Sequence, residues 1–127
     1  MMSEQKFYIC RHCGNLVELI QAGGGQLVCC GEPMEELKPN TVDASQEKHV
    51  PVVTVEGDAV KVAIGAAAHP MTEEHFIQWI FLQTEGGGQH HALKPGDAPE
   101  ATFCLNGDKA VAAYAYCNLH GLWKKEL

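Results

Sequence analysis

The chain lacks any long hydrophobic run, and it has no cluster of positive charge. No apolar stretch approaches the roughly 18 residues that a membrane span requires, so we expect no membrane association. The first ten residues, MMSEQKFYIC, also lack the apolar stretch of a signal peptide, and we expect a cytoplasmic protein. Lys and Arg total 9 against 16 for Asp and Glu, a formal net charge of −7. This balance argues against nucleic acid as a partner, because phosphate binding needs clustered cations.

Aromatic residues are few, at 7%, but cysteine and histidine are plentiful, with 6 and 7 copies in 127 residues. The length suggests one domain, or a small domain with an appendage. Because a cytoplasmic compartment keeps thiols reduced, we interpret the cysteines as metal ligands before disulfides. Cys104 is the exception. It lies in the predicted strand ATFCL, and we expect it to be a buried core thiol.

The N-terminal segment, up to about residue 37, has short apolar runs separated by turn signals at Gly14-Asn15 and Gly23-Gly24-Gly25. It is too small for an independent hydrophobic core, so its fold needs an additional cross-link. The polar residues that follow, KPNTVDASQEKH, are typical of a linker.

Beyond the linker the pattern is that of short strands. Two strands flank a turn at Glu56-Gly57-Asp58, and a strong hairpin signal stands at Asn106-Gly107-Asp108. The segment AVAAYAY has helical propensity, yet its hairpin partner favours a strand. Five or more short strands at regular intervals predict an antiparallel β-sandwich.

Four cysteines within the N-terminal segment have the spacing of a metal site. Cys10-x-x-Cys13 is followed, after fifteen residues, by Cys29-Cys30. Two such pairs on facing turns supply four thiolates for a tetrahedral ion. Adjacent cysteines in an extended strand would point to opposite faces, so ligation by both predicts a distorted turn there. The spacing alone leaves zinc and iron equally open.

A second set of candidate ligands is spread over the rest of the chain. Four histidines stand at junctions between loops and predicted strands or near the end of the chain, where sandwich folds gather functional side chains: His49, His69, His75 and His120. Cys117 lies three residues before the last of them. By contrast, His90 and His91 follow the triple glycine, and we expect them to form a solvated loop tip.

Several stretches resemble the desulfoferrodoxins, a family of two-iron superoxide reductases. They are YICRHCGN, LVCCGEPM, NTVDASQEKHVPV, GAAAHPMTEEHFIQWI, LKPGDAPEATF and YCNLHGLWK, which together span nearly the whole chain in the family's order. The resemblance implies a desulforedoxin-like domain over residues 1–37. It also implies a superoxide reductase domain of immunoglobulin-like β-sandwich fold over residues 38–127, which makes the protein all-β.

The same resemblance implies two mononuclear iron centres per chain. Cys10, Cys13, Cys29 and Cys30 match the ligands of an Fe(Cys)₄ centre. His49, His69, His75, His120 and Cys117 match the four equatorial imidazoles and the axial thiolate of the catalytic iron. Glu47 matches the carboxylate that binds the oxidised iron, and Lys48 matches the cation that guides superoxide and assists proton delivery. We expect the backbone N–H groups of residues 119 and 120 to donate to the axial sulfur.

The implied activity is one-electron reduction of superoxide to hydrogen peroxide without release of dioxygen. The implied partners are superoxide as substrate, a rubredoxin-like electron donor and a second copy of the chain in a homodimer. Zinc or nickel can replace iron in recombinant protein.

Two other functions fit parts of this pattern. A non-enzymatic electron carrier would have a coordinatively saturated second site, to which azide or cyanide fails to bind. A zinc-ribbon interaction module would hold zinc at both sites and would be colourless, whereas iron bound to thiolate absorbs visible light.

Overall fold

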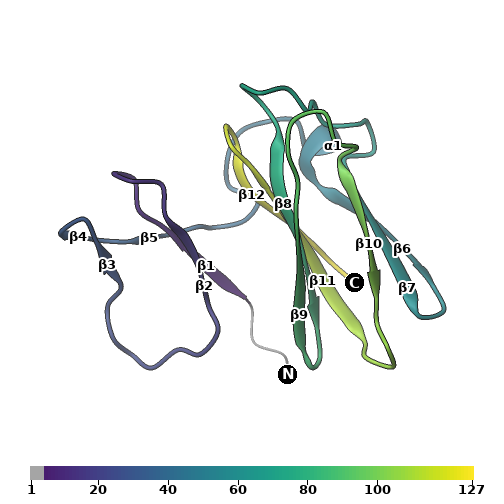
Figure 1. Ribbon diagram of the computed structural model, residues 1–127, viewed down its shortest axis with the longest axis horizontal. Coiled ribbons are helices and arrows are strands. Elements are labelled where there is room, and N and C mark those ends of the chain that lie inside the picture. The colour runs from purple at the N-terminus through teal and green to yellow at the C-terminus, as the bar shows by residue number, and fades with distance from the viewer. Residues whose placement is uncertain (1–4) are drawn as a thin grey trace. The chain divides into compact units, whose positions relative to one another are not determined.

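The structure is a computed structural model that describes residues 5–127 (Figure 1). The chain divides into two compact units, which we call unit 1 (Met1–Lys38) and unit 2 (Pro39–Leu127). Nearly all of the regular structure is antiparallel strand, which confirms the predicted all-β class. Within residues 5–127, no helix has the length and hydrophobicity needed to cross a bilayer.

Unit 1 is built from short strands around a very small core. The strands are β1 (Lys6–Ile9), β2 (Leu16–Leu19), β3 (Val28–Cys29), β4 (Glu32–Pro33) and β5 (Glu35–Glu36). They form one sheet in the order β2-β1-β5 and a separate hairpin of β3 and β4. The buried apolar residues of unit 1, among those that the structure describes, are Phe7, Ile9, Cys10 and Leu37. So few buried side chains do not hold a fold of this size without an additional constraint.

Unit 2 is a sandwich of two antiparallel sheets. Its elements are α1 (Gln46–His49), β6 (Pro51–Glu56), β7 (Ala59–Ile64), β8 (Ile77–Thr84), β9 (Gly87–Ala92), β10 (Glu100–Cys104), β11 (Ala110–Cys117) and β12 (Gly121–Glu126). One sheet has the order β10-β7-β6 and the other β12-β11-β8-β9. The chain passes between the sheets after β7, β9 and β10, which is the connectivity expected of an immunoglobulin-like sandwich.

The core of unit 2 lies between the two sheets. Alternate residues of β7, β10 and β11 face inward, as Val60 and Val62 do on β7 and Ala113 and Ala115 do on β11. Cys117 continues the inward row of β11 and is fully buried at its end. The alternation along β11 confirms that the alanine-rich segment is a strand.

Two sequence-based expectations about unit 2 are wrong. His90 and His91 lie on β9, not in a loop, because the triple glycine contributes its last two residues to that strand. Cys104 is exposed, not buried. It follows Phe103, whose side chain faces the core, so the two-residue period of the strand turns the Cys104 thiol outward.

Candidate metal centres

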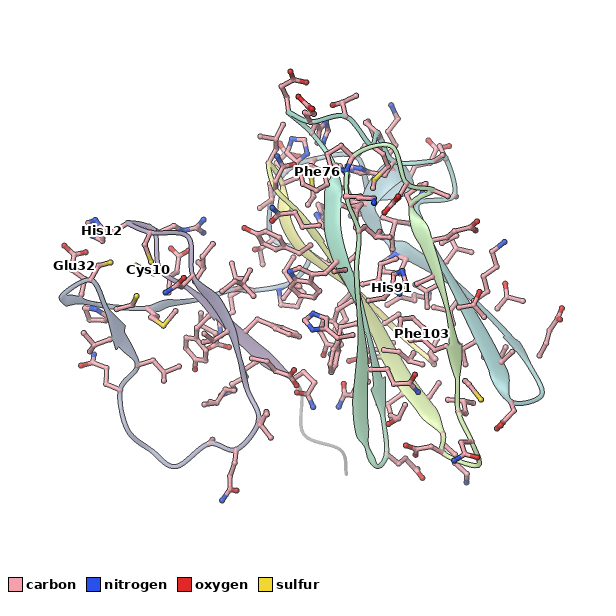
Figure 2. The ribbon with its side chains drawn as sticks, in the orientation of Figure 1. Cys10, His12, Glu32, Phe76, His91 and Phe103 are labelled. Carbon is pink, nitrogen blue, oxygen red and sulfur yellow. The ribbon has the colours of Figure 1, made fainter. Side chains whose placement is uncertain are left out.

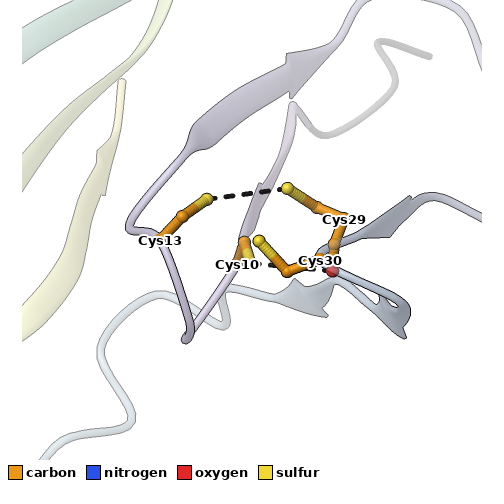
Figure 3. Close-up of side chains that lie close together, drawn as sticks. All are labelled: Cys10, Cys13, Cys29 and Cys30. Carbon is orange, nitrogen blue, oxygen red and sulfur yellow. Dashed lines mark hydrogen bonds between the residues drawn. The ribbon is translucent and has the colours of Figure 1, made fainter.

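Unit 1 brings its four cysteines together (Figure 3). Cys10 and Cys13 flank the turn after β1, and Cys29 and Cys30 lie at the end of β3. The four sulfur atoms lie within 4.8 Å of one another, and the Cys13 and Cys29 sulfurs are 3.6 Å apart. Thiolates arranged tetrahedrally at a bond length of about 2.3 Å are separated by about 3.8 Å, so the cluster fits one metal ion.

The adjacent cysteines reach the same point through a left-handed residue. Cys30 has φ of 54°, a value that residues with a Cβ rarely adopt, and Gly31 follows with φ of 77°. This is the distorted turn that ligation by two neighbouring cysteines requires. The conformation costs free energy, so the rest of the site has to stabilise it.

Hydrogen bonds within the cluster separate the protonation behaviour of its thiols. The backbone N–H of Cys13, followed by that of His12, lowers the pKa of Cys10 to about 6 although burial opposes this. Hydrogen bonds with Cys13 and Cys10 raise the pKa of Cys30 to about 12. Since metal ligation needs all four as thiolates, a bound cation would displace protons from the cluster.

A histidine–carboxylate contact and an ion pair join the loops that carry these cysteines. His12 Nε2 lies 2.8 Å from Glu32 Oε2, and Figure 2 shows this pair beside Cys10 at one end of unit 1. Arg11 pairs with Glu35. Both pairs are well exposed, so their contribution to stability is small.

In unit 2 the second set of candidate ligands gathers at one end of the sandwich. Figure 1 shows α1, the β7–β8 connection and the β11–β12 turn at this end. His49 is the last residue of α1, and His69 and His75 belong to the β7–β8 connection. Cys117 ends β11, and His120 lies in the turn before β12.

The backbone around Gly65 holds α1 against the β7–β8 connection. Gly65 has φ of 86°, and a Cβ there would lie 2.5 Å from the carbonyl oxygen of Lys48. The Ala67 N–H donates to the carbonyl of Glu47 at 3.1 Å, and the His69 N–H donates to that of Ile64 at 3.2 Å. These contacts bring two histidines that are twenty residues apart in the chain to one point.

The tautomers of His49 and His69 follow from their hydrogen-bond partners. His49 Nδ1 lies 2.6 Å from the Ser45 carbonyl oxygen, and His69 Nδ1 lies 2.7 Å from the Pro70 carbonyl oxygen. A carbonyl only accepts, so both Nδ1 atoms carry the proton. Burial lowers the pKa of His49 and lowers that of His69 to about 4, so both rings are neutral and each Nε2 presents a lone pair.

These two lone pairs face each other, with His69 Nε2 only 3.2 Å from His49 Nε2. Two acceptors at this distance repel unless a cation lies between them. His49 Nε2 is also 3.0 Å from His120 Nδ1. Imidazole nitrogens at adjacent corners of a square around a metal are about 3.0 Å apart when each bond is about 2.1 Å, so the spacing fits a metal ion.

His75 supports the same conclusion. Its Nε2 is buried, and among the described residues it is the only such side-chain nitrogen or oxygen without a hydrogen-bond partner. Burial, followed by electrostatic interactions with His120 and Lys48, lowers the pKa of His75 and keeps the ring neutral. A buried, neutral nitrogen without a partner is costly unless a ligand satisfies it.

Cys117 provides sulfur beside these nitrogens. Its ligand atom and those of His49, His69 and His75 lie within 4.8 Å of one another. Burial raises the pKa of the Cys117 thiol, and the backbone N–H groups of Leu119 and His120 partly oppose this by hydrogen bonding to the sulfur. These are the two donors expected from the sequence.

His120 is the outer member of the set. It is not one of the four residues whose ligand atoms are all within 4.8 Å of one another. Its Nδ1 nevertheless lies 3.9 Å from the Cys117 sulfur and points toward His49. Four imidazoles and one cysteine sulfur therefore converge.

The remaining candidates are on α1 and β9. Glu47 and Lys48 are exposed and precede His49 directly. The charge of Lys48 reaches the site, since it contributes to the lowered pKa of both His49 and His75. His90 packs edge-on against Trp79 at 5.2 Å and, like His91, belongs to neither cluster.

Sequence reasoning missed two residues that shape this site. Trp123 stacks on His49 and donates from its indole nitrogen to the His120 carbonyl at 3.1 Å. Asn118 hydrogen-bonds to the backbone on both sides of His75. Trp123 stands three residues after His120, and Asn118 directly follows Cys117. This proximity in the sequence was the available indication of their roles.

A cluster of four cysteines in a small β unit, followed by a cluster of imidazoles and one cysteine at one end of an immunoglobulin-like sandwich, defines a protein with two candidate metal sites of different ligand sets. The family described as Desulfoferrodoxin matches residues 41–126, and the one described as Desulfoferrodoxin, N-terminal domain, matches residues 3–37. The chain belongs to the desulfoferrodoxin family.

Individual relatives agree with this assignment. The chain is 54% identical over 126 residues to a desulfoferrodoxin of Nitratidesulfovibrio vulgaris, covering 99% of each protein. It is 40% identical over 103 residues to a superoxide reductase of Pyrococcus horikoshii, covering 67% of this chain and 90% of the other. The crystal structure of the superoxide reductase from Treponema pallidum superposes with a TM-score of 0.82 at 41% identity, covering 98% of this chain and 100% of that one.

Proposed function

We propose that the protein is a superoxide reductase, which converts superoxide to hydrogen peroxide with one electron and two protons. The main observation behind the proposal is that the Nε2 atoms of His49 and His69 lie 3.2 Å apart, with their lone pairs facing each other beside the buried Cys117. This arrangement calls for a cation. The family membership and the similarity to a superoxide reductase structure point to the reaction.

In unit 2, His49, His69, His75, His120 and Cys117 would hold iron. Bound iron(II) would supply the electron and, held by these five residues, would leave a place for the anion. Three of the imidazoles are neutral by burial, so they can donate lone pairs to a metal and leave its positive charge to attract an anion. The Cys117 sulfur brings the single negative charge of the set, and two backbone N–H groups moderate it.

Lys48 guides the substrate in this proposal. The protein carries a net charge of −7, which repels an anion, so a local positive charge is needed for fast encounter. Lys48 is exposed, and its charge contributes to the lowered pKa of His49 and of His75. Its Nζ is also a source of a proton for the reduced substrate. Glu47, on the same short helix, is the carboxylate proposed to bind the oxidised centre.

We further propose that residues 1–37 form a desulforedoxin-like domain whose four thiolates hold a second iron, and that residues 38–127 form the reductase domain. A centre closed by four cysteines has no place for substrate, so it would serve as an electron relay or a structural staple. An external donor such as rubredoxin would restore the reduced state. The expected assembly is a homodimer in the cytoplasm.

Anaerobic loading with iron(II), followed by rapid mixing with superoxide, tests the function. We expect one hydrogen peroxide for each superoxide consumed by the reduced protein and no dioxygen. The zinc-loaded protein is the matched control, because zinc occupies the same ligands and has no electron to give. Dioxygen as a product would mean dismutation, and it would overturn the proposal.

A further inference from the structure

The segment around His75 is held to the sandwich by one side chain. Asn118 Oδ1 accepts the Phe76 N–H at 2.9 Å, and Asn118 Nδ2 donates to the Glu74 carbonyl at 2.9 Å. The Asn118 backbone N–H also donates to the Phe76 carbonyl at 3.2 Å. Three hydrogen bonds from one residue therefore bracket His75 on both sides.

Thr72 holds the remaining backbone groups of His75. The Thr72 N–H donates to the His75 carbonyl at 2.9 Å, and the His75 N–H donates to the Thr72 carbonyl at 3.2 Å. The Thr72 hydroxyl lies 3.2 Å from both the N–H and the carbonyl of His75. With Asn118, every backbone donor and acceptor from the Glu74 carbonyl to the Phe76 carbonyl is satisfied.

The backbone of His75 is fully hydrogen-bonded, whereas its buried Nε2 has no hydrogen-bond partner within residues 5–127. His49 and His69 are each oriented by a carbonyl that accepts from Nδ1. His75 has no such bond among the described residues, and its buried Nε2 is unpartnered. Its ring is therefore aimed by the backbone that carries it, and Asn118 supplies the connection of that backbone to β11.

We propose that Asn118 is a positioning residue that sets the His75 imidazole relative to the Cys117 thiolate. Asn118 follows Cys117 directly. A single peptide unit therefore separates the residue that carries the sulfur from the residue whose hydrogen bonds hold the segment around His75. The strand pairing is irregular here, since Cys117 pairs with Ile77 whereas Tyr116 pairs with Trp79. Beyond this irregularity one backbone hydrogen bond, from the Asn118 N–H to the Phe76 carbonyl, continues the pairing, and the Asn118 side chain supplies the other two bonds to the segment.

The proposal rests on the proposed function only in taking His75 as a metal ligand, and its test does not use the superoxide reaction. Asn118→Asp keeps the acceptor for Phe76 but replaces the donor to Glu74 with an oxygen. Asn40→Asp is the matched control in unit 2. Asn40 makes the same pair of side-chain bonds, to the N–H and carbonyl of Lys124 at 2.9 and 3.1 Å, away from His75.

Zinc is the probe, because it is diamagnetic and suits imidazole and thiolate ligands. In ¹⁵N-labelled, zinc-loaded wild type, we expect the ring nitrogens of His75 to have the chemical shifts of a coordinated imidazole. In Asn118→Asp the His75 shifts should revert to those of a free ring, and the zinc affinity of unit 2 should fall about 10- to 100-fold. Asn40→Asp should retain coordinated shifts and wild-type affinity. Urea unfolding of the metal-free variants checks that both substitutions destabilise the fold to a similar extent.

The outcomes separate the two proposals. If Asn118→Asp keeps a coordinated His75 with wild-type affinity, or if Asn40→Asp loses zinc equally, Asn118 has no positioning role. If His75 is uncoordinated even in zinc-loaded wild type, the proposed metal site itself is wrong. Should Asn118→Asp fail to fold, Asn118→Ser, which keeps a short polar side chain, replaces it under the same criteria.

Discussion

Trp123 stacks on His49, with ring centroids 4.8 Å apart and planes inclined by 27°. The indole is 1% exposed, and its N–H donates to the carbonyl of His120. One aromatic residue of β12 thus supports one ligand by packing and another through its backbone, although the two are 71 residues apart in the chain.

Replacing Trp123 should weaken both the fold and the metal site. Trp123→Ala removes a buried indole and should lower the free energy of unfolding by about 3–5 kcal/mol. Trp123→Phe keeps a ring beside His49 but leaves the His120 carbonyl without its donor, so it should cost about 1–3 kcal/mol. Urea unfolding of the metal-free protein measures both. Equal stability of the two variants would contradict the separate roles of packing and hydrogen bonding.

Lys48→Ala should slow the reaction with superoxide. Loss of one positive charge near the site should lower the second-order rate about threefold to tenfold and weaken its dependence on ionic strength. Iron content should not change, because the Lys48 side chain is not a ligand. Lys109→Ala, an equal charge change at the opposite end of β11 from Cys117, is the control. An unchanged rate in pulse radiolysis would rule out steering by Lys48.

Glu47→Ala should alter the oxidised protein and spare the reduction step. If the carboxylate binds the oxidised centre, its loss should shift the visible absorption of the oxidised protein and leave the superoxide rate within about twofold of wild type. Absorption spectra at matched pH and stopped-flow rates test this. A spectrum identical to that of the wild type means that Glu47 is not a ligand.

Metal removal should unfold unit 1 before unit 2. Unit 1 buries few apolar side chains and holds Cys30 in a left-handed conformation, so it depends on a bound metal. After chelation, hydrogen exchange should show loss of amide protection in β1 and β2, whereas β8 and β11 stay protected by the core of unit 2. Retained protection in β1 would show that the thiolate cluster is not the staple.

Asp108 should stabilise unit 2 except in acid. Its carboxylate accepts hydrogen bonds from Thr84 and from the backbone N–H groups of Lys109 and Gly86, which lower its pKa below the ordinary value of 3.8. Because the folded state holds the proton less tightly, this stabilisation is complete well above pH 3.8 and is lost as the pH falls below it. Urea midpoints of wild type and Asp108→Asn should therefore differ at pH 7, and the difference should shrink as the pH falls below 3.8. A constant difference would exclude the linkage.

Much of the fold was predictable because short-range patterns encode it. The turn at Glu56-Gly57-Asp58 and the alternation along the next strand predict the β6–β7 hairpin that the structure contains. The same two-residue period, applied from the inward-facing Phe103, would also have turned Cys104 outward. The error there came from treating cysteine as apolar and not from missing information.

The candidate site was less accessible to sequence reasoning, because its geometry is tertiary. Spacing alone did not specify the metal at the four cysteines, and the wide separation of His49, His69, His75 and Cys117 required a family resemblance to group them. The lone-pair arrangement depends on the carbonyls of Ser45 and Pro70, which only the folded backbone brings to the rings. The roles of Asn118 and Trp123 have the same tertiary origin.

The wide separation of His49 and His120 has a thermodynamic consequence. A metal ion bound by both closes a loop that contains every strand from β6 to β11, and it acts as a reversible cross-link in the way a long-range disulfide does. Since only the native chain offers this chelate, a tightly bound metal raises the melting temperature of the molecules that hold it. A partly loaded preparation should therefore melt as two populations, and calorimetry would report its occupancy without any assay of turnover.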